Sequence, residues 1–151
     1  MKKLSQRWHN RMFTHLKEHR KKFNDANQWF SHIRLRYFAG HESYQEHLNT
    51  PIRVAHLTDQ HVGRVTPMKV QIEAIELALA QKPDIVVLTG DFVCHSELYL
   101  NDLTEIIKRI DRPCFAVLGN HDHWTNAEQV RKAPKKGGAE VLDNAHTIVQ
   151  V

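Results

Sequence analysis

The sequence predicts an α/β fold in which a mostly parallel β-sheet is flanked by helices. Three short runs of β-branched and aliphatic residues, at 52–57, 85–88 and 115–118, alternate with segments of helical periodicity. This order is typical of parallel strands joined by helical crossovers. Residues 1–50 differ in composition from the rest, so we expect a domain at 51–151 that follows an N-terminal helical extension at 1–50.

The first strand is predicted at residues 52–58, because its apolar run is followed by Gly63 and Pro67, which are residue types typical of loops. A helix should come next, since apolar residues recur every three or four positions from Met68 to Leu79 and a proline follows at position 83. The second strand, at residues 84–89, is almost continuously apolar. Such strands are typical of parallel sheets that are covered on both faces.

The alternation continues in the second half of the domain. A second helix is predicted from one apolar face, and a third strand from Pro113 to Leu118; the face consists of Leu103, Ile106, Ile107 and Ile110. The segment 125–128, Thr-Asn-Ala-Glu, has the spacing of a capping box, so a short helix should start at Thr125 and end before Gly137. Residues 140–142 and 147–151 are predicted to form two further strands.

Residues 1–50 contain ten lysines and arginines and show no strand pattern. Apolar residues recur at helical spacing around Trp8 and again from Trp29 to Tyr37, which predicts two amphipathic helices with basic outer faces. Three roles stay open for this extension: packing on its own domain, contact with anionic lipid, or contact with nucleic acid. The domain lacks an interleaved aromatic platform, so nucleic acid is the least favoured partner.

Bulk properties favour a cytoplasmic protein, at most peripheral to the inner face of the membrane. No apolar run approaches the roughly 20 residues that span a bilayer. The two cysteines, Cys94 and Cys114, lack the spacing of a zinc ribbon or a disulfide framework, which fits a reducing compartment. The formal charge of +4 is weakly favourable for phosphate-bearing partners.

Residues of metal-ligand type directly follow each of the three predicted strands. They are Asp59 and His61 after the first strand, Asp91 after the second, and Asn120, His121 and Asp122 after the third. Any one of them has an ordinary explanation, because Asp and Asn are common turn residues. Ligands bind at the carboxyl ends of parallel strands, and the repetition at three successive ends therefore predicts one shared metal site. Carboxylate and imidazole ligands suit Mn, Fe, Zn or Ni.

The ordered set Asp59-x-His61, Gly90-Asp91 and Gly119-Asn120-His121-Asp122 resembles the calcineurin-like metallophosphoesterase superfamily. The resemblance covers residues 52–151 and implies half of a four-layer α-β-β-α sandwich. It implies that Asp59 and His61 bind one divalent metal ion, that Asp91 bridges two ions, and that Asn120 binds the second. His121 would stabilise the transition state or protonate the leaving group, and Asp122 would orient it. The implied reaction is hydrolysis of phosphomonoesters or phosphodiesters by water that two metal ions activate.

The sequence departs from the family pattern in three ways. Gln60 stands where the family often has an aliphatic residue, Cys94 stands where many members place an acidic residue, and no Gly-His-x-His segment follows His121 to complete the ligand sets. We therefore expect the N-terminal half of a longer enzyme, with one sheet face lacking its apolar partner, dependence on a missing C-terminal half, and impaired turnover. The alternative is a catalytically inactive remnant that binds metal or a partner.

Overall fold

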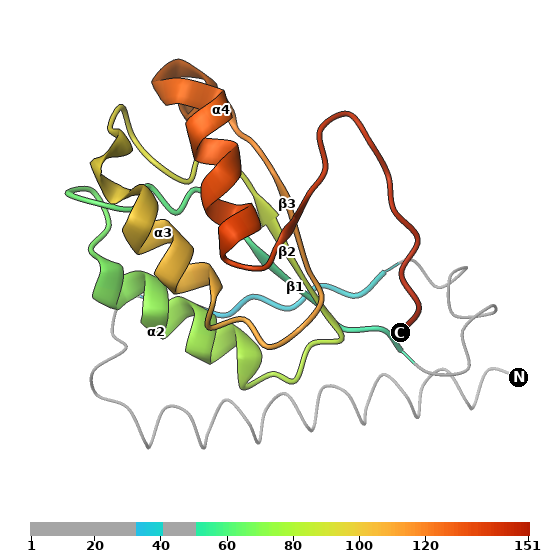
Figure 1. Cartoon of the computed structure of the whole chain (residues 1–151). Helices are drawn as coiled ribbons and strands as arrows, with labels where there is room; N and C mark the ends of the chain where they lie inside the picture. The colour runs from blue at the N-terminus through green and yellow to red at the C-terminus, as the bar shows by residue number, and fades with distance from the viewer. Residues whose placement is uncertain (1–32, 41–50) are drawn as a thin grey trace, which may run out of the picture. The chain divides into compact units, whose positions relative to one another are not determined.

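A computed structural model describes residues 33–40 and 51–151 of the chain (Figure 1). The chain divides into two compact units, Met1–Arg34 and Leu35–Val151. The helices predicted in residues 1–50, and the domain boundary predicted at residue 50, lie mostly outside the described residues and stay predictions. Residues 33–40 have no regular structure, so the predicted helix does not include its last turn up to Tyr37. The Tyr37 hydroxyl instead donates a hydrogen bond to Gln81 Oε1 at 2.8 Å.

The sheet is parallel throughout, which confirms the predicted α/β class. Its four strands are neighbours in chain order: β1 (Val54–Leu57), β2 (Ile85–Thr89), β3 (Cys114–Val117) and β4 (Glu140–Val141). The register pairs Leu57 with Leu88 and Leu88 with Ala116, so the first three strands end at nearly the same level. Their carboxyl ends therefore share one edge of the sheet.

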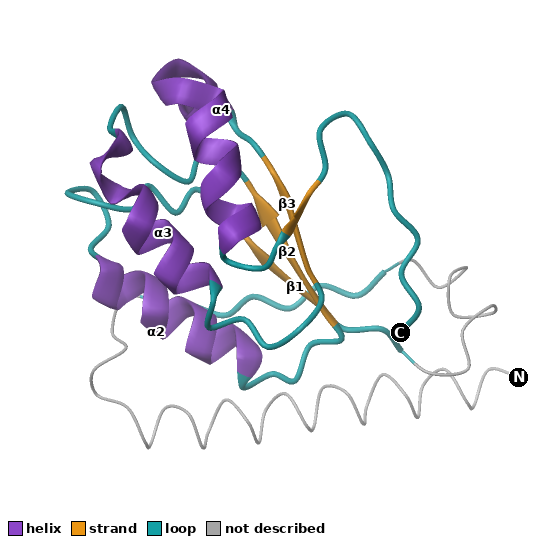
Figure 2. Cartoon of the chain, viewed as in Figure 1, coloured by secondary structure: helices purple, strands orange, loops and turns teal. Residues whose placement is uncertain are grey.

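Three helices lie on one side of this sheet (Figure 2). They are α2 (Met68–Leu79), α3 (Leu100–Ile107) and α4 (Asn120–Lys136), and a 3₁₀ turn, η2 (Glu97–Tyr99), leads into α3. The first two helices occupy their predicted positions. Across residues 33–40 and 51–151, no helix combines the length and the apolar character needed to cross a membrane.

The helix predicted to start at Thr125 corresponds to the second segment of α4, which follows a break at Asn126, but α4 itself begins earlier, directly after Gly119. The Gly119 amide donates to Asp122 Oδ2 at 2.9 Å, which is the backward-reaching half of a capping box. The helix is interrupted at Asn126, where φ is −174°. The Asn126 side chain then accepts a hydrogen bond from the Gln129 amide at 3.3 Å and starts a second helical segment.

The predicted strand at residues 147–151 is absent. The strand before it is confirmed as β4, and beyond it the Leu142 amide still donates to the Ala116 carbonyl at 2.8 Å. The chain then turns at Asn144, whose φ is +50°, and Ile148 is 93% exposed. An extended segment needs a neighbouring strand for its amides, and no described strand pairs with residues 147–151.

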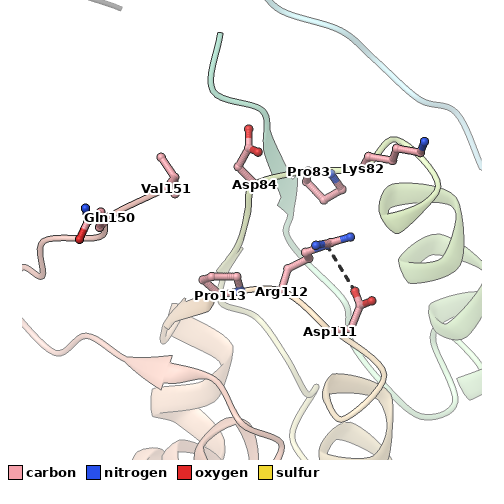
Figure 3. Close-up of a pocket in the computed structure, with 8 residues that line it drawn as sticks. All are labelled: Lys82, Pro83, Asp84, Asp111, Arg112, Pro113, Gln150 and Val151. Carbon is pink, nitrogen blue, oxygen red and sulfur yellow. Dashed lines mark ion pairs between the residues drawn. The ribbon is translucent and has the colours of Figure 1, made fainter. Parts of the chain in front are cut away.

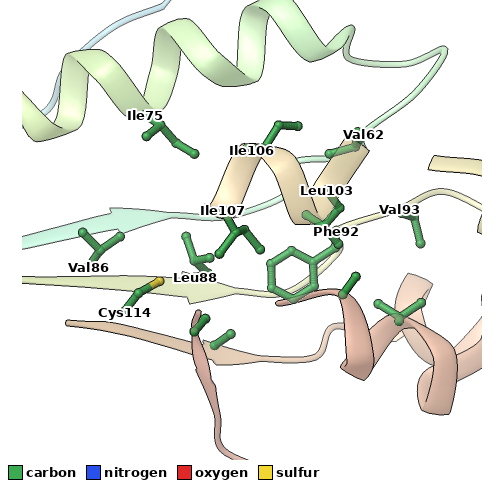
Figure 4. Packing of buried hydrophobic residues seen from close by; sticks show 14 residues of the cluster. Val62, Ile75, Val86, Leu88, Phe92, Val93, Leu103, Ile106, Ile107 and Cys114 are labelled. Atoms are coloured by element: carbon green, nitrogen blue, oxygen red, sulfur yellow. The ribbon is translucent and has the colours of Figure 1, made fainter. Parts of the chain in front are cut away.

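One apolar core lies between the sheet and the helices (Figure 4). Val86 and Leu88 of β2 point into it, whereas Ile85 and Val87 are only half-buried and Thr89 is exposed. Phe92, directly after the predicted metal ligand Asp91, is fully buried in the same core. Full burial of such side chains contributes about 1.5–3 kcal/mol each, so the loop that carries Asp91 is anchored by its own neighbour.

The other face of the sheet is covered by none of the described helices. Val54 in β1 is 53% exposed and Val117 in β3 is 39% exposed, and both lie on the face away from the core. The apolar character of β2 predicted cover on both faces. Within the described residues, the helices cover one.

Candidate metal centre

The loops that follow β1 and β2 run side by side and are joined by backbone hydrogen bonds. The Asp59 amide donates to the Gly90 carbonyl at 3.1 Å, and the His61 amide donates to the Asp91 carbonyl at 2.9 Å. A third bond, from Val62 to Phe92 at 2.8 Å, continues the ladder into the core. These bonds hold the two predicted ligand loops in a fixed register beyond the ends of their strands.

Asp59, His61 and Asp91 converge at this edge. One potential ligand atom from each of them lies within 4.8 Å of the others. All three have a positive φ, at 54°, 42° and 54° respectively, although none is glycine. A non-glycine residue in this region costs on the order of 1–3 kcal/mol, and such strain is concentrated at functional sites. Three other described non-glycine residues also have a positive φ, namely Lys82, His95 and Asn144, so the strain is consistent with a functional site here and does not by itself identify one.

Two glycines allow the loop after β3 to reach this cluster. Gly90 has φ +80°, and a β-carbon there would overlap the backbone of Gly119. A β-carbon on Gly119 would in turn overlap the Asp91 carboxylate and amide. The close approach lets the His121 amide donate to Asp91 Oδ1 at 3.0 Å. The loop after β3 thereby orients the Asp91 carboxylate.

Asp122 is fully buried and ties the loops together. Its Oδ1 accepts hydrogen bonds from the amides of Phe92 and Val93 at 2.8 and 3.2 Å, and its Oδ2 accepts the bond from Gly119. Burial raises the pKa of the Asp122 carboxyl, the three amides lower it, and the Asp91 charge adds a smaller upward effect. Among the described residues, its carboxylate bonds only to backbone amides, so any orienting effect on His121 passes through the backbone.

Asn120 is the first residue of α4 and is exposed at the same edge. It lies between Gly119 and His121, both of which are packed against Asp91. This exposed position is compatible with a metal ligand, and the assignment of Asn120 as a ligand stays a prediction.

The His121 ring sits among side chains that the sequence alone did not bring together. Its centroid lies 4.8 Å from the His61 ring and 4.7 Å from the Trp124 ring. Its Nδ1 atom is 3.8 Å from Cys94 Sγ, and the His95 ring, 5.4 Å away, stacks on Trp124. Sequence reasoning treated Cys94 only as a departure from the family and did not connect Trp124 with His121. The spacing of three residues along a helix was the available signal for Trp124.

The residues present fit a divalent cation. The His61 ring is largely buried, and its Nδ1 atom has no hydrogen-bond partner among the described residues. Its Nε2 atom lies 3.9 Å from Asp59 Oδ1. A buried polar atom without a partner costs about 1–3 kcal/mol. Carboxylate oxygens beside imidazole nitrogens form the donor set that Mn, Fe, Zn and Ni accept.

A pocket next to the cluster offers space for a substrate. It is lined by His61 and Cys94 on the side of the cluster, by Arg64, and by apolar side chains that include Val65 and Leu98. Val65 and Leu98 are mostly exposed at its rim. The pocket thus joins possible metal ligands, a cation and apolar surface.

A second pocket lies at the opposite, amino-terminal edge of the sheet (Figure 3). Its lining residues precede β2 and β3 or lie at the end of the chain, and they include Asp84, Asp111 and Arg112. Arg112 and Asp111 form an exposed ion pair at 3.6 Å. The two groups of possible metal ligands found within the described residues lie at the carboxyl edge instead.

Comparison with known proteins agrees with this geometry. Residues 52–148 match the family model of the calcineurin-like phosphoesterases. The chain is 29% identical over 127 residues to phosphodiesterase YaeI of Escherichia coli (strain K12), which covers 80% of this chain and 45% of that protein. It is 32% identical over 96 residues to an uncharacterised metallophosphoesterase of Aquifex aeolicus (strain VF5), covering 62% of this chain and 36% of that protein.

A third relative is UDP-2,3-diacylglucosamine pyrophosphatase LpxG of Chlamydia muridarum (strain MoPn / Nigg). It is 32% identical over 77 residues, which cover 49% of this chain and 23% of that protein. The chain thus spans less than half the length of each of these relatives. The family match extends over all three ligand loops, and the chain therefore belongs to the calcineurin-like phosphoesterase family of metal-dependent enzymes.

Proposed function

We propose that the protein hydrolyses phosphodiester or phosphomonoester bonds with the help of two divalent ions drawn from Mn, Fe, Zn and Ni. The observation that carries the proposal is the convergence of Asp59, His61 and Asp91 in strained loops beside the His121 ring. Two relatives are named as a phosphodiesterase and a pyrophosphatase. These names support hydrolysis of a bond between a phosphoryl group and an oxygen atom.

The ligand roles follow from position. Asp59 and His61 would hold one ion, Asp91 would be shared, and Asn120 would hold the second. When bound, the ions polarise a phosphoryl oxygen and make water nucleophilic near neutral pH. Because the His121 amide fixes Asp91 Oδ1, the carboxylate needs little reorganisation to serve as the shared ligand.

His121 would donate a proton to the leaving oxygen. Imidazole groups titrate near neutral pH and are effective general acids there. The ring is half-buried and is held between His61 and Trp124. Arg64, which lines the adjoining pocket, would attract the phosphate charge, and the apolar rim formed by Val65 and Leu98 would contact the rest of the substrate.

Calorimetric titration with Mn²⁺ tests the metal centre. We expect Asp91→Asn to weaken binding at least about tenfold, because removal of a single orienting partner already costs metal sites that much. Asp111→Asn is the matched control, since this carboxylate is exposed at the other edge of the sheet and should leave the affinity unchanged. Equal affinities for wild type and Asp91→Asn would refute the assignment.

We further infer that residues 1–151 alone turn over slowly. Two four-coordinate ions that share one ligand need about seven donors, and the proposed set supplies Asp59, His61, Asp91 and Asn120. The remaining donors would come from a further segment or a second chain. The same deficit favours the second candidate function, a module that binds metal or a partner without turnover.

A chromogenic phosphodiester such as bis(4-nitrophenyl) phosphate separates the two functions. Metal-dependent hydrolysis by residues 1–151 that is lost in His121→Ala supports the enzyme. Mn²⁺ binding with no turnover by this chain supports the binding module. Absence of Mn²⁺ binding would contradict the enzyme and the metal-binding module, and would favour a remnant that binds a partner.

We also propose that residues 1–50 bring the protein to the inner, cytoplasmic face of a membrane. The proposal is supported by the ten basic residues and the helical spacing of the apolar ones in this segment. Sedimentation with anionic vesicles should decrease when the segment is removed, and sedimentation with neutral vesicles should be low for both forms. Equal sedimentation with anionic vesicles would contradict the proposal.

A further inference from the structure

A second group of potential metal ligands lies beside the oxygen-rich set and contains sulfur. His61 comes from the loop after β1, Cys94 from the loop after β2, and His121 from the first turn of α4. One ligand atom from each lies within 4.8 Å of the others, and all three residues are half-buried. Three separate segments therefore bring nitrogen and sulfur donors to one point.

The contacts within the group leave donor atoms available. Cys94 Sγ lies 3.8 Å from His121 Nδ1, at the long end of a sulfur hydrogen bond. His61 has a buried Nδ1 atom with no hydrogen-bond partner within the described part of the chain. The other nitrogen of His61 lies on the side of Asp59, at 3.9 Å from its carboxylate. His61 can thus belong either to the oxygen-rich set or to the sulfur-containing one.

The two sets differ in chemistry. Asp59 and Asp91 provide hard oxygen ligands, which suit Mn²⁺ and similar ions. Two imidazoles and one thiolate are softer, and this combination with one open position is typical of zinc sites. We propose that His61, Cys94 and His121 form a binding site for a zinc-class divalent cation, and that the Cys94 thiol releases its proton to solvent as the ion binds.

Occupancy of this site has a consequence for the rest of the centre. The ion would engage His61 and His121 together, so one histidine would leave the oxygen-rich set and the other would cease to be a proton donor. An ion held by the sulfur-containing set should therefore compete with Mn²⁺ for His61 at this edge of the sheet. The proposal goes beyond phosphoester hydrolysis and does not depend on it, since it concerns binding alone.

Cobalt titration tests the sulfur ligand directly. Co²⁺ occupies zinc sites, and a bound thiolate gives it a charge-transfer absorption in the near ultraviolet. The chain has only two cysteines, Cys94 and Cys114, and Cys114 is buried in the core, so each can be removed in turn. We expect the band in wild type and in Cys114→Ala, and its loss in Cys94→Ala. Persistence of the band in Cys94→Ala, or its absence from wild type, would overturn the proposal.

A measurement on the unaltered chain guards against misfolding of a variant. Peptide mass spectrometry after iodoacetamide treatment follows alkylation of Cys94. A Zn²⁺ concentration about ten times its dissociation constant should slow this alkylation about tenfold, by mass action. The same concentration of Mg²⁺, a hard cation, should leave the rate unchanged. An unchanged rate with Zn²⁺ would overturn the proposal even if Mn²⁺ binding at Asp91 were demonstrated, so the two results are distinguishable.

Discussion

Replacement of Asp122 by alanine should destabilise the whole domain rather than the metal centre alone. The carboxylate is fully buried and accepts three backbone hydrogen bonds, from Phe92, Val93 and Gly119. Each buried amide left without a partner costs about 1–3 kcal/mol, so the three together cost about 3–9 kcal/mol. In the wild type, burial opposes the charge of this carboxylate, and this cost offsets part of the stabilisation from the three hydrogen bonds. We therefore expect the free energy of unfolding to fall by an amount near the lower bound of that range.

Urea denaturation followed by circular dichroism measures this loss. A domain of ordinary stability, about 5–15 kcal/mol, would lose a large share of it and show a clearly lower midpoint. Asp143→Ala is the control, because Asp143 is exposed and its ion pair with Arg131 contributes about 0–1 kcal/mol. If the two variants unfold at the same urea concentration, Asp122 does not hold the three loops together.

Four further substitutions or measurements address the loops, the thiols and the core. Gly90→Ala should be more destabilising than Gly138→Ala and should also weaken Mn²⁺ binding. Both glycines have a positive φ, but only Gly90 lacks space for a β-carbon. Equal losses would contradict the close approach. In native protein at pH 8, iodoacetamide should modify Cys94 and spare Cys114, because burial raises the pKa of the Cys114 thiol to about 12. Because the folded protein keeps the Cys114 proton to a higher pH than the unfolded chain does, the buried thiol contributes stability that is present below pH 9 and is lost as the pH rises through about 12. Urea titrations should show a smaller alkaline loss of stability in Cys114→Ala. Phe92→Ala should cost about 3–5 kcal/mol, and a loss below about 1 kcal/mol would contradict its place in the core.

The sheet and the position of the metal ligands could be predicted because each depends on short-range patterns. Each apolar run ends in a glycine or a polar turn residue, which locates the strand end within one or two positions. Parallel register then places the residues after those ends at one edge, as observed for Asp59, His61 and Asp91. The strand predicted at residues 147–151 does not form, because this depends on more than a short-range pattern. An alternating segment forms a strand only where a partner strand is available.

The surroundings of His121 could not be predicted in the same way. The position of Cys94 depends on the path of the loop after β2, which turns at His95 with φ +54°. No periodicity in the sequence encodes such a turn. The contact between Trp124 and His121 could have been predicted, because the two residues are three apart on one helix. The helix, however, was predicted to start after both of them.

Asp122 shows how one motif can mix chemical and structural residues. The segment Gly119-Asn120-His121-Asp122 was interpreted as carrying three functional side chains. Because α4 starts within this segment, the side chains of Asn120, His121 and Asp122 point in different directions. At the third helical position, Asp122 reaches back to the Gly119 amide, where an acidic group also favours the helix dipole. A glycine cap has no side chain to complete the capping box, so the sequence signal was incomplete. His121→Ala should therefore abolish proton donation with little loss of stability, whereas Asp122→Ala should lower stability first, and the ratio of the two effects separates chemistry from support within four residues.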